Sequence, residues 1–225
     1  MLELQSCCKS IRLPSGDTLQ LLRDLSLKIL PGESLAILGR SGTGKSTLLG
    51  LLGLLDTLDC GSYRVDGQET VGLCDRALAN LRGRTFGFIY QRFCLMSRLS
   101  AFQNVEAPLL HRPGRRADRH KAVYEALDKV GLIERAKHKP DQLSGGEQQR
   151  VAIARALVHN PHVILADEPT GSLDRSTGTM ILRLLFNLVK EAGVTLVVVT
   201  HEPLIAAQIE RVLELSNGAL KDGNL

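Results

Sequence analysis

Three short runs of consecutive apolar residues stand out along the chain, and each is followed by a loop. They span residues 35–38, 163–166 and 196–199. Strands that are covered by helices on both faces carry such unbroken apolar runs, which are typical of a parallel sheet. Ligands of open α/β sheets bind at the carboxyl ends of the strands. We therefore expect the loops that begin at Gly39, Asp167 and Thr200 to meet at one site.

The first thirty residues have a different pattern, in which short apolar stretches lie on either side of a turn. Residues 2–4 and 25–29 flank a turn cluster at Pro14–Asp17, and the later stretch alternates apolar and polar side chains. This alternation predicts antiparallel strands with one face on the core and one face in water. Near the C-terminus, the run Arg211–Leu215 followed by Ser216-Asn217-Gly218 predicts a strand that ends in a hairpin turn.

Helical periodicity dominates the middle of the chain. Apolar residues recur at helical spacing within 122–130 and again within 180–188, and no strong strand pattern occurs in 92–158. We expect residues 92–158 to form a helical subdomain that is inserted into a core made of residues 1–91 and 159–225. The whole chain would then be a single domain.

Composition excludes several classes of protein. With 225 residues, 44% of them hydrophobic and 23% charged, the chain resembles a folded globular protein and not a disordered one. The apolar run 48–55 is far shorter than the roughly 20 residues of a membrane span. No charged and then apolar leader opens the chain, so a secretory signal is not expected. Five cysteines without a CxxC pair favour reduced thiols over a zinc ribbon or a disulfide framework.

Charge narrows the range of partners. The net charge of +4 and the aromatic content of 4% argue against nucleic acid, which is bound by strongly basic patches and aromatic platforms. Arginine, lysine and histidine gather in residues 111–121. We interpret this stretch as a solvated surface, with contact to lipid headgroups or an acidic partner as the alternative.

A nine-residue segment directly after the first apolar run begins with the pattern GxxxxGK[ST]. Its residues are Gly39, Arg40, Ser41, Gly42, Thr43, Gly44, Lys45, Ser46 and Thr47. Glycines let the backbone wrap a polyphosphate, so that its N–H groups face the phosphate oxygens. In this pattern the lysine reaches the β- and γ-phosphates, and the hydroxyl of Ser46 ligates Mg²⁺. A helix that begins at Lys45 adds the positive end of its dipole.

A candidate partner for this loop follows the second apolar run. Asp167, at the end of a buried strand, can hold Mg²⁺ through water, and the adjacent Glu168 can orient or polarise an attacking water. An apolar run that ends in Asp-Glu is common and is a weak signal alone. With the phosphate loop present, the pair is its expected partner.

The stretch Leu143–Arg150, which reads LSGGEQQR, predicts a second anion site. A serine can cap the following helix, and two glycines expose backbone N–H groups at its N-terminus. One interpretation is a helix cap and nothing more. The other is a site for the nucleotide of a second copy, which a two-fold pairing would bring there. The residues concerned are Leu143, Ser144, Gly145, Gly146 and Glu147.

Together these motifs resemble the nucleotide-binding subunits of ABC transporters, in the same order and over essentially the whole chain. Leu143–Arg150 resembles their signature motif, and Gln91, after the strand-like Phe86–Tyr90, resembles their Q-loop glutamine. Ser172-Leu173-Asp174 resembles the D-loop, and His201 resembles the switch histidine. The resemblance implies an α/β fold: a P-loop NTPase (RecA-like) core with an N-terminal antiparallel β-subdomain and an inserted helical subdomain.

The resemblance also implies a mechanism, in which two subunits sandwich two molecules of ATP with Mg²⁺. The loop 39–47 of one subunit would face residues 144–146 of the other, and hydrolysis would drive the subunits apart. Glu168 would be the catalytic carboxylate, assisted by Lys45 and by His201 at the γ-phosphate.

Two further residues complete the implied site. Gln91 would contact Mg²⁺ and the water, which makes Ser46, Gln91 and Asp167 the implied metal ligands. Asp174 would link the two sites across the interface. The family usually stacks an aromatic residue on adenine about where Ile11 stands here, so we expect that stacking to be lost or replaced by apolar contact.

Within the family, three segments resemble the branch of lipoprotein-releasing, macrolide-exporting and related cell-division ATPases. They are residues 86–91, 103–110 and 165–174. The expected function is an ATP-hydrolysing subunit that dimerises on ATP at the cytoplasmic face of a bacterial inner or plasma membrane. Because the chain ends at Leu225, soon after the core, we expect the membrane permease to be a separate polypeptide.

Two other functions fit the sequence less well. A non-transport ABC ATPase that acts on ribosomes or nucleic acid usually has two cassettes or a long insert, whereas the segment between Gln91 and Ser144 is short here. A switch GTPase would carry an NKxD motif, which is absent from the sequence, and would have no use for LSGGE.

Overall fold

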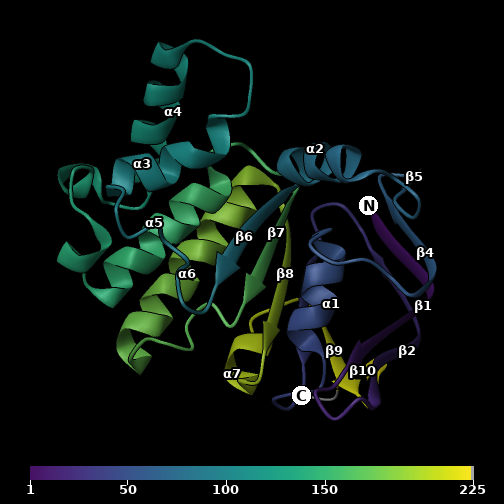
Figure 1. Cartoon of the computed structure of the whole chain (residues 1–225). Helices are drawn as coiled ribbons and strands as arrows, with labels where there is room; N and C mark the ends of the chain where they lie inside the picture. Colours follow the sequence, from purple (N-terminus) through teal and green to yellow (C-terminus); the bar gives the residue numbers. More distant parts are fainter. Residues whose placement is uncertain (224–225) are drawn as a thin grey trace. The chain divides into compact units, whose positions relative to one another are not determined.

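The structure is a computed structural model that describes residues 1–223. The chain forms two compact units. The first consists of Met1–Arg82 together with the segment from Thr195 onward, and the second consists of Gly83–Val194. Figure 1 shows their elements in the colours of the sequence.

The first unit contains an antiparallel sheet in the order β2-β1-β4-β5. Its strands are β1 (Leu2–Arg12), β2 (Thr18–Ile29), β4 (Cys60–Val65) and β5 (Gln68–Glu69). The predicted antiparallel strands are confirmed, but β1 and β2 extend far beyond the predicted stretches 2–4 and 25–29. Their pairing shifts register three times between Leu4 and Ser10. Each irregularity changes the face to which the next residues point, which breaks the alternation that predicts a strand.

A second set of strands in the same unit has the order β10-β9-β3-β8. The strands are β3 (Ser34–Leu38), β8 (Thr195–Thr200), β9 (Arg211–Ser216) and β10 (Ala219–Asp222). β3 runs parallel to both β8 and β9, and β9 and β10 form the predicted C-terminal hairpin. Residues 35–37 and 197–199 are completely buried, as unbroken apolar runs in a parallel sheet predict.

Two helices follow strands of this second set. They are α1 (Lys45–Leu52) and the short α7 (Pro203–Ala206). The predicted helix start at Lys45 is confirmed, but α1 ends at Leu52, inside the apolar run 48–55. Gly53 caps the helix, and Leu54 has a positive φ of 57°, which no helix continues. The last three residues of the apolar stretch therefore lie outside the helix.

The second unit has two parallel strands and four longer helices. The strands are β6 (Phe86–Tyr90) and β7 (Val163–Asp167), and the helices are α3 (Ala101–Glu106), α4 (Arg116–Lys129), α5 (Gly145–Leu157) and α6 (Arg175–Ala192). Helix α2 (Asp75–Thr85) spans the boundary between the units, and short 3₁₀ turns occupy 107–109, 133–135 and 140–142. Residues 92–158 contain helices and no strand, in agreement with their periodicity. The division into a core and an inserted subdomain at these bounds stays a prediction.

The helix lengths bear on membrane insertion. The longest helix, α6, has 18 residues and buries one apolar side that includes Ile181, Leu185 and Leu188. Within residues 1–223, no helix combines the length and the apolar character that crossing a membrane requires.

Candidate functional site

The phosphate loop in the first unit connects β3 to α1 by a tight backbone turn. Gly42 and Gly44 have φ values of +80° and +97°, a left-handed conformation that side chains other than glycine rarely adopt. At Gly39, a Cβ atom would lie 2.9 Å from the carbonyl oxygen of Leu215. The glycines of the motif are therefore needed by the geometry of the loop itself, which brings its backbone N–H groups to the start of α1.

Lys45 is the first residue of α1, as predicted, and its side chain folds over the loop. The ammonium Nζ donates hydrogen bonds to the carbonyl oxygens of Gly39 at 2.8 Å and of Arg40 at 3.0 Å. Although it is charged, the residue is only 6% exposed. The loop thus holds a positive charge against its own backbone, at the position where the sequence pattern predicts β- and γ-phosphates.

His201 lies at the same edge of the strands as the phosphate loop. β3 and β8 are parallel, and their last residues, Leu38 and Thr200, are paired. Gly39 and His201 therefore leave neighbouring strands at the same end. The loop after β8 is tightened by the hydroxyl of Thr200, which accepts a hydrogen bond from the backbone N–H of Glu202 at 3.1 Å. The structure thus brings two of the predicted elements together within this unit.

Ile11 lies near the end of β1, opposite Leu19 of β2. The two side chains are 39% and 42% exposed, so they form a small apolar surface where the resemblance places an aromatic ring. That this surface contacts adenine in place of an aromatic ring stays a prediction.

The second unit places Gln91, Asp167 and Glu168 at one strand edge. β6 and β7 are parallel, and Tyr90 is paired with Asp167. Gln91 and Glu168 are therefore the first residues beyond two neighbouring strand ends. Glu168 has a positive φ of 45°, which is uncommon for a residue other than glycine, and the backbone N–H of Gly171 donates to its carbonyl oxygen at 3.0 Å.

The loop after β7 also holds the Q-loop glutamine. The hydroxyl of Ser172 donates to the carbonyl oxygen of Gln91 at 2.6 Å. A Cβ atom on Gly171 would lie 2.8 Å from Nε2 of Gln91, so a larger residue there would displace the glutamine side chain. The structure thus ties the predicted Q-loop and D-loop to each other.

Ser144 caps the N-terminus of α5, as predicted. Its hydroxyl oxygen accepts from the N–H of Glu147 at 3.3 Å and donates to the Glu147 carboxylate at 2.8 Å. The same carboxylate accepts from the N–H of Ser144, which completes a capping box. These bonds from Ser144, together with the nearby Arg135 guanidinium at 3.2 Å, lower the pKa of Glu147. A carboxylate beside the signature glycines is thereby held ionised and paired.

The first turns of α5 and α6 are in close contact. A Cβ atom on Gly146 would lie 2.7 Å from Cγ2 of Thr177, and one on Gly145 would lie 3.2 Å from Cδ2 of Leu173. Asp174 caps α6 and accepts from the N–H groups of Ser176 and Thr177, at 3.1 Å each. Hydrogen bonds from these two residues hold the pKa of Asp174 well below its usual value. The predicted signature and D-loop residues are therefore neighbours.

The predicted site residues thus form two groups, one in each unit. The phosphate loop, His201 and Ile11 belong to the first unit. Gln91, the Asp167-Glu168 pair, residues 143–147 and Asp174 belong to the second. Within each unit the structure brings the expected neighbours together. That the phosphate loop, His201 and the group around Glu168 serve one nucleotide stays a prediction. It also stays a prediction that residues 143–147 meet the nucleotide of a second copy.

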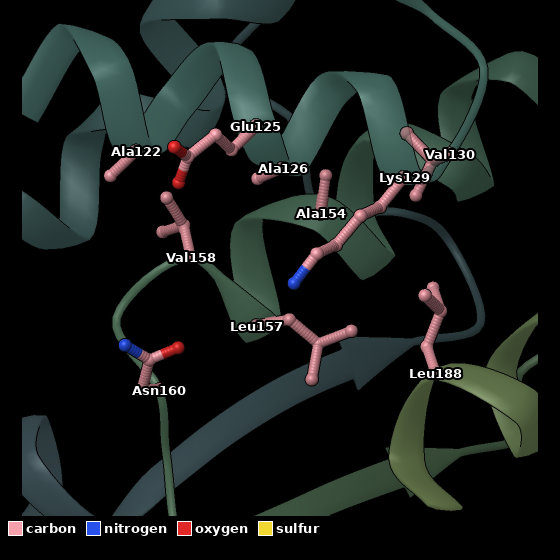
Figure 2. A pocket seen from close by; sticks show the side chains of 10 residues that line it. All are labelled: Ala122, Glu125, Ala126, Lys129, Val130, Ala154, Leu157, Val158, Asn160 and Leu188. Atoms are coloured by element: carbon pink, nitrogen blue, oxygen red, sulfur yellow. The ribbon is translucent and has the colours of Figure 1, made fainter. Parts of the chain in front are cut away.

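The second unit also contains a cavity of about 80 Å³. Figure 2 shows the side chains of Glu125, Lys129 and Asn160 beside the apolar Leu157 and Leu188. It is lined by α4, the end of α5 with the loop after it, and α6. None of the predicted site residues is among its described lining residues, so we assign it no part in the site.

With this geometry in place, comparison with known proteins decides the family. Residues 22–171 match the family described as ABC transporter. This chain belongs to the ABC transporter family. The α/β P-loop fold predicted from the sequence is confirmed with it, as is the interpretation of the chain as an ATP-binding cassette.

Two curated relatives are macrolide export ATP-binding/permease proteins named MacB. The protein from Rhodopseudomonas palustris is 50% identical over 208 residues, which are 92% of this chain and 32% of that protein. The protein from Hahella chejuensis is 49% identical over 199 residues, which are 88% of this chain and 30% of that protein. The chain therefore spans about a third of the length of these relatives.

A solved structure is similar over nearly the whole chain. It is the dimeric post-hydrolysis state of the ATP-binding cassette MJ0796 bound to ADP and Pi. The two share 41% identity and a TM-score of 0.89, over 99% of this chain and 98% of the other. The predicted membership of the ABC transporter family is thereby confirmed. The similarity to macrolide export proteins agrees with the branch that the sequence resembles.

Sequence reasoning did not single out two side chains that shape the second unit's group. Arg135 pairs with Glu147, and Gln149 is completely buried beneath the signature turn with its amide against the carbonyl oxygen of Pro169. Gln149 lies within the LSGGEQQR motif, but an exposed helical glutamine would look the same in the sequence. Only its burial and its contact across the fold distinguish it.

Proposed function

We propose that this chain binds ATP and hydrolyses it as a dimer, each copy contributing a phosphate loop to one nucleotide and a signature helix to the other. The proposal rests on two features of this same chain. A glycine-containing phosphate loop precedes α1, and a capped glycine turn precedes α5. A single nucleotide would need only the first of these. The similar cassette MJ0796 is dimeric in its post-hydrolysis state, which supports the two-copy arrangement.

In this proposal the phosphate loop binds the triphosphate. Backbone N–H groups at the start of α1 bind phosphate oxygens, because a helix N-terminus carries unsatisfied donors and the positive end of the dipole. Lys45, now bonded to the carbonyl oxygens of Gly39 and Arg40, turns its ammonium toward the β- and γ-phosphates. His201, at the neighbouring strand end, donates a hydrogen bond to the γ-phosphate.

Glu168 orients the attacking water in this scheme. It follows directly on Asp167 at the end of β7, and its left-handed backbone turns the chain sharply at that point. Phosphoryl transfer depends mainly on positioning and electrostatic stabilisation, so a carboxylate held at a fixed strand end suits this role. Gln91, at the neighbouring strand end, reports the state of the site to a membrane partner.

The oxygen donors of the predicted metal ligands fit Mg²⁺. A serine hydroxyl, a glutamine amide oxygen and an aspartate carboxylate are hard ligands, and Mg²⁺ in such sites keeps several waters. Ser46 lies in the first turn of α1, while the pairing of Tyr90 with Asp167 brings Gln91 beside Asp167. When bound, the ion neutralises charge on the β- and γ-phosphates.

The proposed partner is an integral membrane permease, on whose cytoplasmic face the cassette dimer would bind. The relatives' names join an ATP-binding part with a permease, which supports such a partner for this chain. Export, lipoprotein release and transmission of force to an extracytoplasmic domain are the candidate uses of the hydrolysis energy. We expect no nucleic-acid partner, since the net charge is only +4.

The experiment that tests this function uses Glu168→Gln. The variant should bind ATP, lose hydrolysis and accumulate as an ATP-bound dimer, because the water loses its carboxylate while the binding contacts stay. Glu191→Gln, an exposed residue near the end of α6, is the matched control and should hydrolyse normally. Undiminished turnover in Glu168→Gln would remove that residue from its role.

The same variant identifies the partner. Tagged Glu168→Gln protein with Mg-ATP is used to capture proteins from detergent-solubilised native membranes, followed by mass spectrometry. A permease with few spans and a large extracytoplasmic domain would support the force-transmitting branch. Recovery of ribosomes or DNA without a membrane protein would overturn the transport function.

A further inference from the structure

Gln149 is a buried polar side chain that the proposed mechanism does not use. It lies on α5 and is 0% exposed, and its Nε2 donates to the carbonyl oxygen of Pro169 at 2.5 Å. Its Oε1 is buried without a hydrogen-bond partner among the described residues. A buried amide with one half unsatisfied costs free energy that an apolar side chain would not. Helix stability alone therefore does not explain why a glutamine occupies this buried position, and its donated hydrogen bond needs another explanation.

The acceptor of that bond belongs to the turn that carries Glu168. Pro169 follows Glu168 directly, and Glu168 has a φ of +45°, a conformation that costs roughly 1–2 kcal/mol for a side-chain-bearing residue. Such a backbone persists only when its surroundings hold it. Two hydrogen bonds do so here: the N–H of Gly171 to the carbonyl oxygen of Glu168, and the amide of Gln149 to the carbonyl oxygen of Pro169.

The donor of the bond belongs to the signature helix. Gln149 lies four residues after Gly145, about one helical turn below it, so both are on one side of α5. The first turn of α5 is rigidly closed by the capping box of Ser144 and Glu147. A displacement of that turn would be carried along the helix to Gln149.

We propose that Gln149 is a positioning residue that sets the Glu168 carboxylate from the signature helix. This inference rests on the proposed function, in which Glu168 serves the nucleotide of its own subunit and the signature turn meets the nucleotide of the partner subunit. Gln149 then joins the two: binding of nucleotide at the signature turn of one copy fixes the catalytic carboxylate in that same copy. It couples the two sites of the dimer through the interior of the second unit.

The test compares two substitutions of Gln149 in the full chain. Gln149→Met keeps the length of the side chain and removes the donor. Because misplacement of a catalytic group costs about 10- to 100-fold in rate, kcat should fall by that order while the ATP KM changes less than about twofold. The Hill coefficient for ATP should fall toward 1, since the link between the sites is lost.

Gln149→Glu supplies a readout that loss of packing would not change. An ionised carboxylate cannot donate to the carbonyl oxygen of Pro169, but a protonated one can. The activity of Gln149→Glu relative to the unsubstituted chain should therefore rise as the pH is lowered, while that of Gln149→Met should not. Equal pH profiles for the two variants would contradict the proposal.

Val151→Ala is the control for stability. Val151 is completely buried on the same helix and removing its two methyl groups lowers stability without touching a polar contact. If the two variants have the same Tm and kcat falls no further in Gln149→Met than in Val151→Ala, the positioning role is wrong. Failure of the proposed function is recognised separately, because Glu168→Gln would then hydrolyse ATP normally whatever Gln149 does.

Discussion

Helices α1 and α5 both begin with glycine-containing turns, yet their N-termini are satisfied in opposite ways. At α1 the capping residue is Gly44 in a left-handed conformation, no described side chain caps the helix, and its first turn holds no acidic residue. At α5 the capping residue is Ser144 in an extended conformation, and Glu147 completes a capping box. No described side chain caps the first terminus, whereas the second already binds the chain's own carboxylate.

Because of this difference, we expect the two helix N-termini to bind anions with different strength. The start of α1 has no acidic residue in its first turn and has the ammonium of Lys45 beside it, which suits strong binding of a triphosphate. The start of α5 carries the ionised Glu147, whose charge is balanced by Arg135. Such a terminus binds an anion weakly by itself, and we expect it to contribute only when a second copy supplies the nucleotide.

The largest expected effect comes from breaking the α1 site. Lys45→Ala removes the ammonium that donates to the carbonyl oxygens of Gly39 and Arg40. Because loss of one preorganised charged donor costs about 100-fold or more in rate, ATPase activity should fall by at least that factor. Steady-state ATPase assays measure it, with the exposed Lys190→Ala on α6 as the control. Activity within about tenfold of the unsubstituted chain would contradict the account.

A smaller effect is expected from closing the gap between α5 and α6. In Gly146→Ala the new Cβ would lie 2.7 Å from Cγ2 of Thr177, so the signature turn must move. Overpacking of this kind costs about 1–3 kcal/mol, and we expect ATPase activity to fall about tenfold. Adding Thr177→Ser removes the clashing methyl group and keeps the N–H that bonds Asp174, so it should restore activity.

The control for this pair is Gly83→Ala on α2, where a Cβ meets no atom within 4 Å. That change should leave activity unaltered and raise Tm slightly, since alanine favours a helix over glycine by about 1 kcal/mol. If the double variant Gly146→Ala/Thr177→Ser were as inactive as Gly146→Ala alone, the contact would not explain the loss.

The capping box of α5 predicts a dependence of stability on pH. The folded-state pKa of Glu147 lies below its ordinary value of 4.5, so its contribution is present above pH 4.5 and is lost as the pH falls through the lowered value. A carboxylate charge in the first turn of a helix contributes about 0.3–1 kcal/mol, or about 1–4 °C in Tm for a chain of this length.

Glu147→Gln tests this directly by thermal unfolding at several pH values. The Tm of the variant should lie below that of the unsubstituted chain at pH 7, and the two should converge below pH 4.5. The exposed Glu191→Gln should show no such convergence. A Tm difference for Glu147→Gln that grows toward acid would reverse the predicted sign.

The smallest expected effect concerns the base of the nucleotide. Ile11→Tyr places an aromatic ring beside Leu19, where the resemblance expects one. An aromatic stack contributes about 1 kcal/mol, so the dissociation constant for ATP should fall about fivefold. Calorimetry with Glu168→Gln protein measures it without hydrolysis. An unchanged dissociation constant would mean that adenine is held elsewhere.

Sequence patterns predict those parts of the fold that depend on residues close to one another in the chain. The apolar runs at 35–38, 163–166 and 196–199 are strands because burial on both faces requires an unbroken run. The lengths of β1 and β2 could not be predicted, because Ser6 and Asp24 adopt positive φ values that interrupt the alternation. The end of α1 at Leu52 was missed because leucine favours a helix, whereas the backbone at Gly53 and Leu54 does not continue it.

The same distinction between local and distant contacts applies to the candidate site. The phosphate loop and the cap of α5 were predictable, because glycine spacing and Ser-x-x-Glu act within a few residues. Gln149 and Arg135 were not, because each acts through a partner that lies elsewhere in the chain. The roles of His201 and Asp174 came from resemblance, whereas that of Glu168 was also inferred from its place after a buried strand. All three stay predictions until the variants are measured.

The most direct measurement is the mass of the complex that forms with ATP when Ser144 is changed. Native mass spectrometry compares Glu168→Gln with Glu168→Gln/Ser144→Arg. The control is Glu168→Gln/Ser100→Arg, because Ser100 caps α3 with the same kind of capping box. We expect a dimer with two ATP for the first and the control, and a monomer that still binds one ATP for Ser144→Arg. A Ser144→Arg dimer would show that the residue is only a helix cap, and a monomer without ATP would show that it acts within its own subunit; either would contradict the account.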